Sequence, residues 1–240
     1  MNFSLMEDRW NNLANSPSHW KHPGDPRAPH VILREGLHSD RFIDTLQHLS
    51  AIPNLIRAAE DLADALRERI RRERERLGRY RPLWIFGSPM AGISLGTEVA
   101  RLILGTDNFG FTEKTPEGEL ICRFNVPAGA LVLRVEEMTT TGGTPKKAGE
   151  AILKKNPDVT LLPFVGAYLI RCSRRPEQLS GSELECVISL PELGIESGEW
   201  TKEECPLCKA GSRAIKNPKL VWNDLLRTMT DPTHEVPVRN

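Results

Sequence analysis

Near-continuous apolar runs that alternate with helical stretches constrain the fold of this chain more than any other feature. Residues 82–104 read as a buried strand, a glycine-rich loop and a helix, and residues 130–138 and 144–156 read as a second strand and a second helix. Further apolar runs follow at 159–171 and 184–190. Strands covered on both faces carry such uninterrupted apolar sequence, and strand–helix alternation is typical of parallel sheets. The sequence therefore predicts an α/β domain with a mostly parallel central sheet of about five strands, flanked by helices.

The segments around this core are predicted from their own local patterns. Pro53 and the apolar residues that recur at helical spacing predict a helix over 53–77. Its last turns and the following loop carry eight arginines and three glutamates between Arg67 and Arg81. Interleaved Arg and Glu are typical of a solvated helix face, which we favour over a nucleic-acid surface. We predict a core over 51–195, an N-terminal segment over 1–50 and a C-terminal tail over 196–240, the last two forming a small hood over the strand ends.

Composition excludes several classes of protein. The 240 residues contain 32 Lys and Arg against 32 Asp and Glu. Because the formal net charge is zero, nothing directs the whole chain to nucleic acid or to an anionic membrane. No apolar run approaches the roughly 20 residues of a membrane-spanning helix, and the first residues lack the pattern of a signal peptide. Five cysteines, an odd number, are most simply reduced thiols, so we expect a cytoplasmic protein.

Two acids and a threonine–glycine turn follow the apolar strand at 130–135. The acids are Glu136 and Glu137, and the turn comprises Thr139, Thr140, Thr141, Gly142, Gly143 and Thr144. Glycines and free N–H groups at a helix start suit a phosphate, whereas carboxylates suit ribose hydroxyls or hydrated Mg²⁺. In open parallel sheets, ligands bind at this edge of the strands. The order favours a phosphorylated ribose over the alternative of a capped helix beside two exposed glutamates.

Two segments resemble the family of type I phosphoribosyltransferases. VLRVEEMTTTGGT resembles the family's signature for 5-phosphoribosyl diphosphate (PRPP), with two glutamates where aspartates are usual. WIFGSPMAGISLGTEVA, at 84–100, resembles the strand, loop and helix whose loop binds the pyrophosphate of PRPP. The loop residues would be Gly87, Ser88, Pro89, Met90, Ala91 and Gly92. An ordinary strand-to-helix turn would have a similar sequence, so the second segment supports the family only beside the first.

Two further segments narrow the resemblance to the orotate phosphoribosyltransferases. VILREGLHSDRFIDT, which we expect to form a strand, a turn and a short strand, is similar to their N-terminal pattern, and AYLIRCS matches a strand that ends in an orotate-binding arginine. The resemblance implies that Arg34 lies near base and pyrophosphate, and that the base site includes Phe42, Ile43, Thr140 and Arg171. A guanidinium fork suits a planar carboxylate such as that of orotate. By itself, the first segment would equally fit a plain hairpin, and a lone arginine at a strand end is more often a surface charge.

The resemblance implies an activity as well as a fold. The enzyme would transfer 5-phosphoribosyl from PRPP to a nucleobase nitrogen, with orotate giving orotidine 5′-monophosphate and pyrophosphate in pyrimidine biosynthesis. Glu136 and Glu137 would hold the ribose hydroxyls, and Lys114, on a closing loop, would stabilise the leaving pyrophosphate. Mg²⁺ would accompany PRPP, and the chain would form a homodimer that binds neither nucleic acid nor membrane.

Departures from the family pattern keep two alternatives open. Residues 109–126 predict an exposed hairpin or a mobile loop, where the family has a loop rich in basic residues. Here Lys114 is the one basic residue of its first half, Glu117 stands where a histidine is usual, and Ala91 replaces a frequent lysine. Fewer cations would therefore face the pyrophosphate. The alternatives are a phosphoribosyltransferase for a purine base and a PRPP-binding regulatory protein without catalysis.

The tail contains one Cys-x-x-Cys pair, Cys205 and Cys208. A structural zinc site needs four ligands, and such a pair supplies two. Two more would have to come from Cys172, Cys186, His234 or a partner chain. The sequence therefore favours a reduced, packed turn over zinc, and a zinc-stabilised RNA-binding module is a weaker interpretation still. The CPLCKAGS tail also resembles that of a subgroup of orotate-phosphoribosyltransferase-like proteins.

Overall fold

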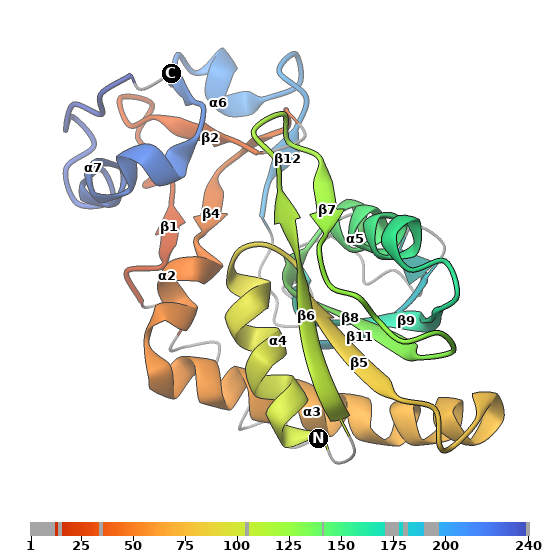
Figure 1. Ribbon diagram of the computed structural model, residues 1–240. Helices are drawn as coiled ribbons and strands as arrows, with labels where there is room; N and C mark the ends of the chain where they lie inside the picture. Colours follow the sequence, from red (N-terminus) through yellow and green to blue (C-terminus); the bar gives the residue numbers. More distant parts are fainter. Residues whose placement is uncertain are drawn as a thin grey trace. The chain divides into compact units, whose positions relative to one another are not determined.

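The computed structural model describes residues 13, 16–33, 36–103, 106–140, 142–170, 178–179, 182–189 and 197–238, without the side chains of 106–107, 170, 178–179 and 182–189 (Figure 1). Arg34, Thr141 and Arg171 lie outside the described residues. The chain divides into two compact units. The core unit comprises Leu49–Gly194, and the terminal unit combines Met1–His48 with Ile195–Asn240.

A seven-stranded sheet forms the centre of the core unit. Its order is β10-β11-β9-β8-β5-β6-β7. The bounds are β5 Leu83–Gly87, β6 Thr106–Lys114, β7 Leu120–Cys122, β8 Leu131–Thr139, β9 Thr160–Ile170, β10 Gln178–Leu179 and β11 Ser182–Ser189. The five strands from β11 to β6 are parallel, whereas β10 and β7 pair antiparallel at the two edges. The prediction of a mostly parallel sheet of five strands is confirmed, and two short strands extend it.

Three helices cover both faces of this sheet: α3 Ile52–Leu77, α4 Ala91–Leu102 and α5 Gly143–Lys155. Helix α3 approaches β9 closely, since a Cβ on Gly166 would lie 2.9 Å from a Leu66 methyl carbon. Helix α5 covers the opposite face, where a Cβ on its Gly149 would lie 3.1 Å from Arg134 Nη1. Figure 1 shows α4 and α5 on opposite sides of the sheet. The alternation of strand and helix thus produces the doubly covered sheet that the apolar runs predict.

The outer face of α3 is solvated, as its arginine–glutamate pattern predicts. Arg71 makes ion pairs of 2.7 Å with both Glu68 and Glu75, and Arg76 pairs with Glu73 at 2.6 Å. These pairs lie three or four residues apart, which is the spacing at which side chains meet on a helix. The arginines are therefore largely neutralised by their own helix.

The terminal unit is built from short elements of both chain segments. Strands β1 His19–Lys21 and β4 Arg41–Ile43 pair antiparallel. A four-stranded sheet has the order β12-β3-β2-β13, with β2 His30–Ile32, β3 His38–Ser39, β12 Glu199–Trp200 and β13 Ala214–Ile215. The helical elements are α2 Thr45–Ser50, which continues into the core unit, α6 Pro206–Lys209, η2 Pro218–Val221 and α7 Trp222–Arg227. Its larger apolar cluster joins Trp20 and Val31 to Trp222 and Leu225, so the two segments share one interior.

Within the described residues, no helix combines the length and the apolar character needed to cross a membrane.

Candidate functional site

Strand β5 of the core unit ends beside the acidic pair of its neighbour β8, so the two predicted PRPP motifs meet. Strands β5 and β8 are parallel, with Gly87 opposite Val135. The ladder continues one residue further, where the Ser88 N–H donates to the Val135 carbonyl at 3.1 Å. Strand β8 continues to Thr139 and stays paired with β9. The predicted pyrophosphate loop at 87–92 therefore leaves the sheet beside the acidic pair at 136–137, at the edge where open α/β sheets bind ligands.

The loop after β5 folds back so tightly that glycine is required at its start. A Cβ on Gly87 would lie 2.2 Å from the Gly92 carbonyl oxygen and 2.9 Å from the Ile93 Cα. The loop brings Gly92 over the end of β5, while Met90 stays 69% exposed and the peptide bond between Pro89 and Met90 is cis. Ala91 begins α4 and is buried. The loop can therefore offer backbone N–H groups to a ligand, but no lysine at this position.

Glu137 faces this loop. A Cβ on Gly92 would lie 3.2 Å from Glu137 Oε2 and 3.6 Å from Ser88 Cβ, so the three residues form one small cluster. Both Glu137 Oε2 and Ser88 Oγ are buried without a hydrogen-bond partner among the residues that the structure describes. Leaving such an atom unsatisfied costs about 1–3 kcal/mol. A ligand with hydroxyl groups would satisfy both oxygens.

The Glu136 side chain lies on the other face of β8. Side chains alternate along a strand, so Glu136 shares its face with Arg134 and not with Glu137. Glu136 is 2% exposed and Arg134 is 5% exposed, and Arg134 lies beneath α5. Burial lowers the pKa of Arg134, whose guanidinium donates to the Leu162 carbonyl at 3.2 Å and the Pro145 carbonyl at 3.4 Å. The two acids of the motif therefore have different surroundings, and Glu137 is the one beside the predicted pyrophosphate loop.

The threonine–glycine turn connects β8 to α5. Thr139 is buried, and its hydroxyl oxygen accepts the Gly142 N–H at 3.1 Å. Gly142 has a left-handed conformation, with φ of 77°, that glycine adopts without steric cost. Gly143 and Thr144 open α5 and are half-buried, and no acidic residue lies in the first helical turn. This helix start suits an anion, as the sequence predicts for the 5-phosphate.

The segment predicted as a hairpin or a mobile loop is a hairpin. Strand β7 pairs with the end of β6, with Lys114 opposite Leu120, and Thr115 donates to the Glu119 carbonyl at 2.8 Å. Lys114 is exposed at the hairpin end, whereas Arg123 is occupied by a 2.5 Å ion pair with Glu113. Hydrogen bonds from its own N–H and from Thr115 lower the pKa of Glu117. The hairpin end thus carries an anion where the family pattern has a histidine.

Phe42 and Ile43, predicted to line the base site, belong to β4 of the terminal unit. The Phe42 ring lies 5.8 Å from that of Trp222, and Ile43 is 2% exposed. Both contribute to the interior of their own unit, so a role against the base stays a prediction.

The Cys-x-x-Cys pair meets two histidines that the sequence interpretation missed. His30, His38, Cys205 and Cys208 place their ligand atoms within 4.8 Å of one another. Burial and, to a smaller extent, the neighbouring His38 and His22 lower the pKa of His30 to about 4. The sequence signal that could have indicated these two histidines lies in the β2–β3 hairpin. Ile32 pairs with His38 there, and the alternation of side chains therefore places His30 on the same face as His38.

Of the other ligands considered for zinc, His234 does not join this cluster. His234 lies 3.2 Å from Asp224 Oδ1, with which it makes an ion pair when protonated. Cys172 and the side chain of Cys186 lie outside the described part of the chain.

Comparison with known proteins identifies the family. No family model matches the chain. The orotate phosphoribosyltransferase of Sulfurovum sp. (strain NBC37-1) is 31% identical over 193 residues, which cover 78% of this chain and 90% of the relative. The chain belongs to the orotate phosphoribosyltransferase family. The enzyme of the same name from Heliobacterium modesticaldum is 30% identical over 189 residues, covering 78% of this chain and 87% of the relative.

The orotate phosphoribosyltransferase fold is shared as well. The crystal structure of the Mycobacterium tuberculosis enzyme in complex with inorganic phosphate matches with a TM-score of 0.52 at 15% identity, covering 79% of this chain and 98% of that chain. The family, its enzyme class and the fold that the sequence motifs predicted are thus confirmed. The roles of individual residues stay predictions.

Proposed function

We propose that this chain transfers the 5-phosphoribosyl group of PRPP to orotate and releases orotidine 5′-monophosphate and pyrophosphate, a reaction of pyrimidine biosynthesis. The observation that carries the proposal is the cluster of Glu137, Ser88 and Gly92, where β5 ends beside β8. In PRPP, the ribose hydroxyls lie next to the pyrophosphate. A carboxylate for the hydroxyls therefore has to lie beside a backbone loop for the pyrophosphate, which is the arrangement of these three residues.

Each end of PRPP has a matching element in the core unit. The 5-phosphate would bind at the start of α5, with the turn at 139–144 supplying N–H groups and hydroxyls. The pyrophosphate would bind the loop at 87–92. Since Glu137 faces this loop and Glu136 is buried on the opposite face of β8, we assign the direct contact with the ribose hydroxyls to Glu137 and retain Glu136 as the second acid of the motif.

The proposed chemistry needs no covalent nucleophile from the protein. The bond between ribose C1 and the pyrophosphate oxygen breaks with both electrons leaving on pyrophosphate, through an oxocarbenium-like state. A base nitrogen, which gives up its proton to solvent, donates its electron pair to C1 from the opposite face, so that the configuration inverts. The protein contributes by positioning the two reactants and by stabilising charge on the leaving group. Lys114 is the exposed cation of the β6–β7 hairpin that we assign to that charge.

Mg²⁺ is the cofactor that the family resemblance implies. The buried Glu137 Oε2, which has no hydrogen-bond partner among the described residues, is a hard oxygen ligand that fits a hydrated Mg²⁺ as well as a ribose hydroxyl. When bound, Mg²⁺ supplies positive charge that neutralises the pyrophosphate oxygens. Glu137 would hold the ion through water, and its neighbours Ser88 and Gly92 would orient the pyrophosphate.

The acceptor site rests on the resemblance. Arg171 would bind the orotate carboxylate, Arg34 would lie near base and pyrophosphate, and Phe42, Ile43 and Thr140 would line the base. We also propose a homodimer, which static light scattering would detect, and a cytoplasmic location.

A turnover assay across a panel of bases tests the proposal. Pyrophosphate release is measured with PRPP, Mg²⁺ and one base at a time: orotate, uracil, adenine or hypoxanthine. We expect release with orotate only. Release with a purine would favour the purine enzyme. PRPP binding without release from any base would contradict catalysis and favour a regulatory PRPP-binding protein.

A further inference from the structure

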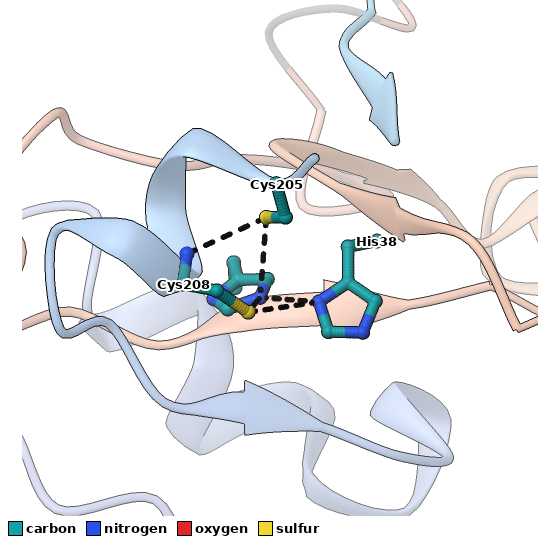
Figure 2. Close-up of side chains that lie close together, drawn as sticks. His38, Cys205 and Cys208 are labelled. Carbon is teal, nitrogen blue, oxygen red and sulfur yellow. Dashed lines mark hydrogen bonds between the residues drawn. The ribbon is translucent and has the colours of Figure 1, made fainter. Parts of the chain in front are cut away.

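Four side chains with metal-binding atoms converge inside the terminal unit. The Cys208 sulfur lies 3.4 Å from His30 Nε2 and 3.3 Å from His38 Nδ1, and the Cys205 sulfur lies 3.7 Å from His30 Nε2. The two imidazole nitrogens are 2.8 Å apart. Figure 2 shows the Cys208 sulfur directed toward His38, with the Cys205 sulfur close to Cys208. No other group of three or more His, Cys, Asp or Glu side chains comes this close within the described part of the chain.

We propose that His30, His38, Cys205 and Cys208 bind one Zn²⁺ as a closed, tetrahedral structural site. Tetrahedral zinc, with bonds of about 2.0 Å to nitrogen and 2.3 Å to sulfur, holds nitrogen and sulfur ligands roughly 3.5 Å apart. The three observed sulfur–nitrogen distances of 3.3–3.7 Å agree with this separation. The nitrogen pair is shorter than the roughly 3.3 Å of a tetrahedral site, so a bound ion would separate the two rings slightly.

The surroundings of His30 fix the protonation that a metal ligand needs. Ser212 donates its hydroxyl hydrogen to the Ala28 carbonyl at 2.7 Å. Because a serine has one such hydrogen, the 2.9 Å contact between Ser212 Oγ and His30 Nδ1 requires the imidazole to donate. The proton on Nδ1 leaves a lone pair on Nε2, which is the atom that faces the two sulfurs. An outer hydrogen bond of this kind is typical of metal-binding histidines.

The cysteine pair lies on a turn that is shaped around its first sulfur. Cys205 accepts the Cys208 N–H at 3.5 Å, and the turn closes with Gly211 donating to the Cys208 carbonyl at 3.0 Å. Gly211 has φ of 90°, a left-handed conformation that favours glycine. The sequence CPLCKAG therefore encodes a rigid knuckle, and not merely two cysteines close together.

The ligand set and its burial favour zinc in a structural role. Two thiolates and two imidazoles form the S₂N₂ set that selects zinc over the oxygen-preferring Mg²⁺ and Ca²⁺. His30 and Cys205 have no exposed surface and His38 is 4% exposed. Four protein ligands leave no position for a water or a substrate, which distinguishes the site from a catalytic zinc. None of the four residues is among those that we propose to bind PRPP.

The ligands tie together the two chain segments of the terminal unit. The two histidines lie in its N-terminal segment and the two cysteines in its C-terminal segment, 167–178 positions away. A clip across so long a loop removes a large conformational entropy from the unfolded chain. Zinc would therefore stabilise a unit whose two halves are joined in sequence only through the core unit.

Metal analysis of the full chain tests the site directly. Purified without chelators or a histidine tag, the chain is expected to contain about one zinc per molecule by mass spectrometry. Cys208→Ser should lower this content at least about tenfold. Two variants serve as controls: His234→Gln removes a histidine of the same unit, and Cys122→Ser removes a buried cysteine of the core unit. Both should retain the zinc of the parent chain.

A spectroscopic measurement keeps the test independent of variant folding. The parent chain, produced with Co²⁺ in place of zinc, should show sulfur-to-cobalt charge-transfer absorption together with the intense visible bands of a tetrahedral site. A zinc content of the parent chain no higher than the background of a metal-free control protein would overturn the proposal. Equal zinc content in Cys208→Ser would overturn it too, and so would octahedral cobalt bands or a Cys205–Cys208 disulfide in the native chain.

Discussion

The core unit and the terminal unit fill their interiors in different ways. Strand β8 of the core unit has Leu131, Val132, Leu133 and Val135 fully buried, and the strands beside it continue this apolar layer. The strands of the terminal unit are two or three residues long. Their surroundings contain many buried polar side chains: Ser18, His19, His22, His30, His38, Ser39, Asp44, Thr45, His48, Ser212 and Thr228.

This difference shows where each unit obtains its stability. Apolar burial is non-directional and scales with area, so the stability of the core unit is spread over its whole sheet. Buried polar groups need specific partners. In the terminal unit several of these contacts join its two segments, as when Trp20 Nε1 donates to Thr228 and Trp222 Nε1 donates to the Pro17 carbonyl. A few contacts, with the proposed zinc site among them, should therefore decide whether the terminal unit folds.

Removal of zinc should produce the largest difference in stability between the two units. In small zinc domains the metal contributes about 10 kcal/mol of folding free energy. After chelation, hydrogen exchange at β2 and β13 should accelerate at least about a hundredfold, and zinc addition should reverse the change. Amides of β5 and β8 should keep their protection. Equal acceleration in both units would contradict the comparison, and unchanged exchange at β2 would contradict a structural role for the metal.

Phe86→Ala should destabilise the core unit and leave the proposed zinc site of the terminal unit intact. The Phe86 ring is 1% exposed and lies 6.0 Å from Trp84 and 5.9 Å from Phe124. Truncation of such a ring destabilises by about 3–5 kcal/mol, because it removes buried surface and leaves a cavity. Native-state hydrogen exchange of β5 and β8 measures the loss, and zinc content should not change. Phe42→Ala, in the terminal unit, is the matched control and should leave β5 and β8 protected.

Glu137→Gln should affect catalysis and neither unit's stability. The substitution keeps the size of the side chain but replaces the charged Oε2 beside Gly92, so PRPP turnover should fall about a hundredfold. Steady-state pyrophosphate release measures the change, and circular dichroism checks the fold. Glu150→Gln, an exposed substitution on α5, should retain full activity. Parental activity in Glu137→Gln would contradict the assigned ribose contact.

Elements that depend on one continuous segment could be predicted from the sequence. The long helix is observed at Ile52–Leu77 against a predicted 53–77, and β8 at Leu131–Thr139 against 130–138. The periodicity of apolar residues determines both. The apposition of the loop at 87–92 and the acids at 136–137 follows in the same way, because the loop ends one of two adjacent parallel strands and the acids lie near the carboxyl end of the other. Strand alternation would also have predicted that Glu136 and Glu137 face opposite sides.

The metal cluster could be predicted only in part. No local pattern connects His30 to Cys205, which is 175 positions away, because their proximity depends on how the two segments of the terminal unit fold together. The preference for a packed turn followed from counting two ligands where zinc needs four. The available local signal was the shared face of His30 and His38 in the hairpin around Gly36.

Ser212→Ala should give the smallest effect and the sharpest test of the polar interior. The variant removes the acceptor of His30 Nδ1 but none of the four zinc ligands. Loss of such an outer hydrogen bond lowers metal affinity by roughly 10–100-fold. The zinc affinity measured by competition with a chelator should therefore fall at least about tenfold. Ser16→Ala is the matched control, since Ser16 donates to the Leu13 carbonyl at 2.7 Å in the same unit. Equal zinc affinity in the two variants would show that Ser212 does not orient His30, and that the histidine is held by its strand alone.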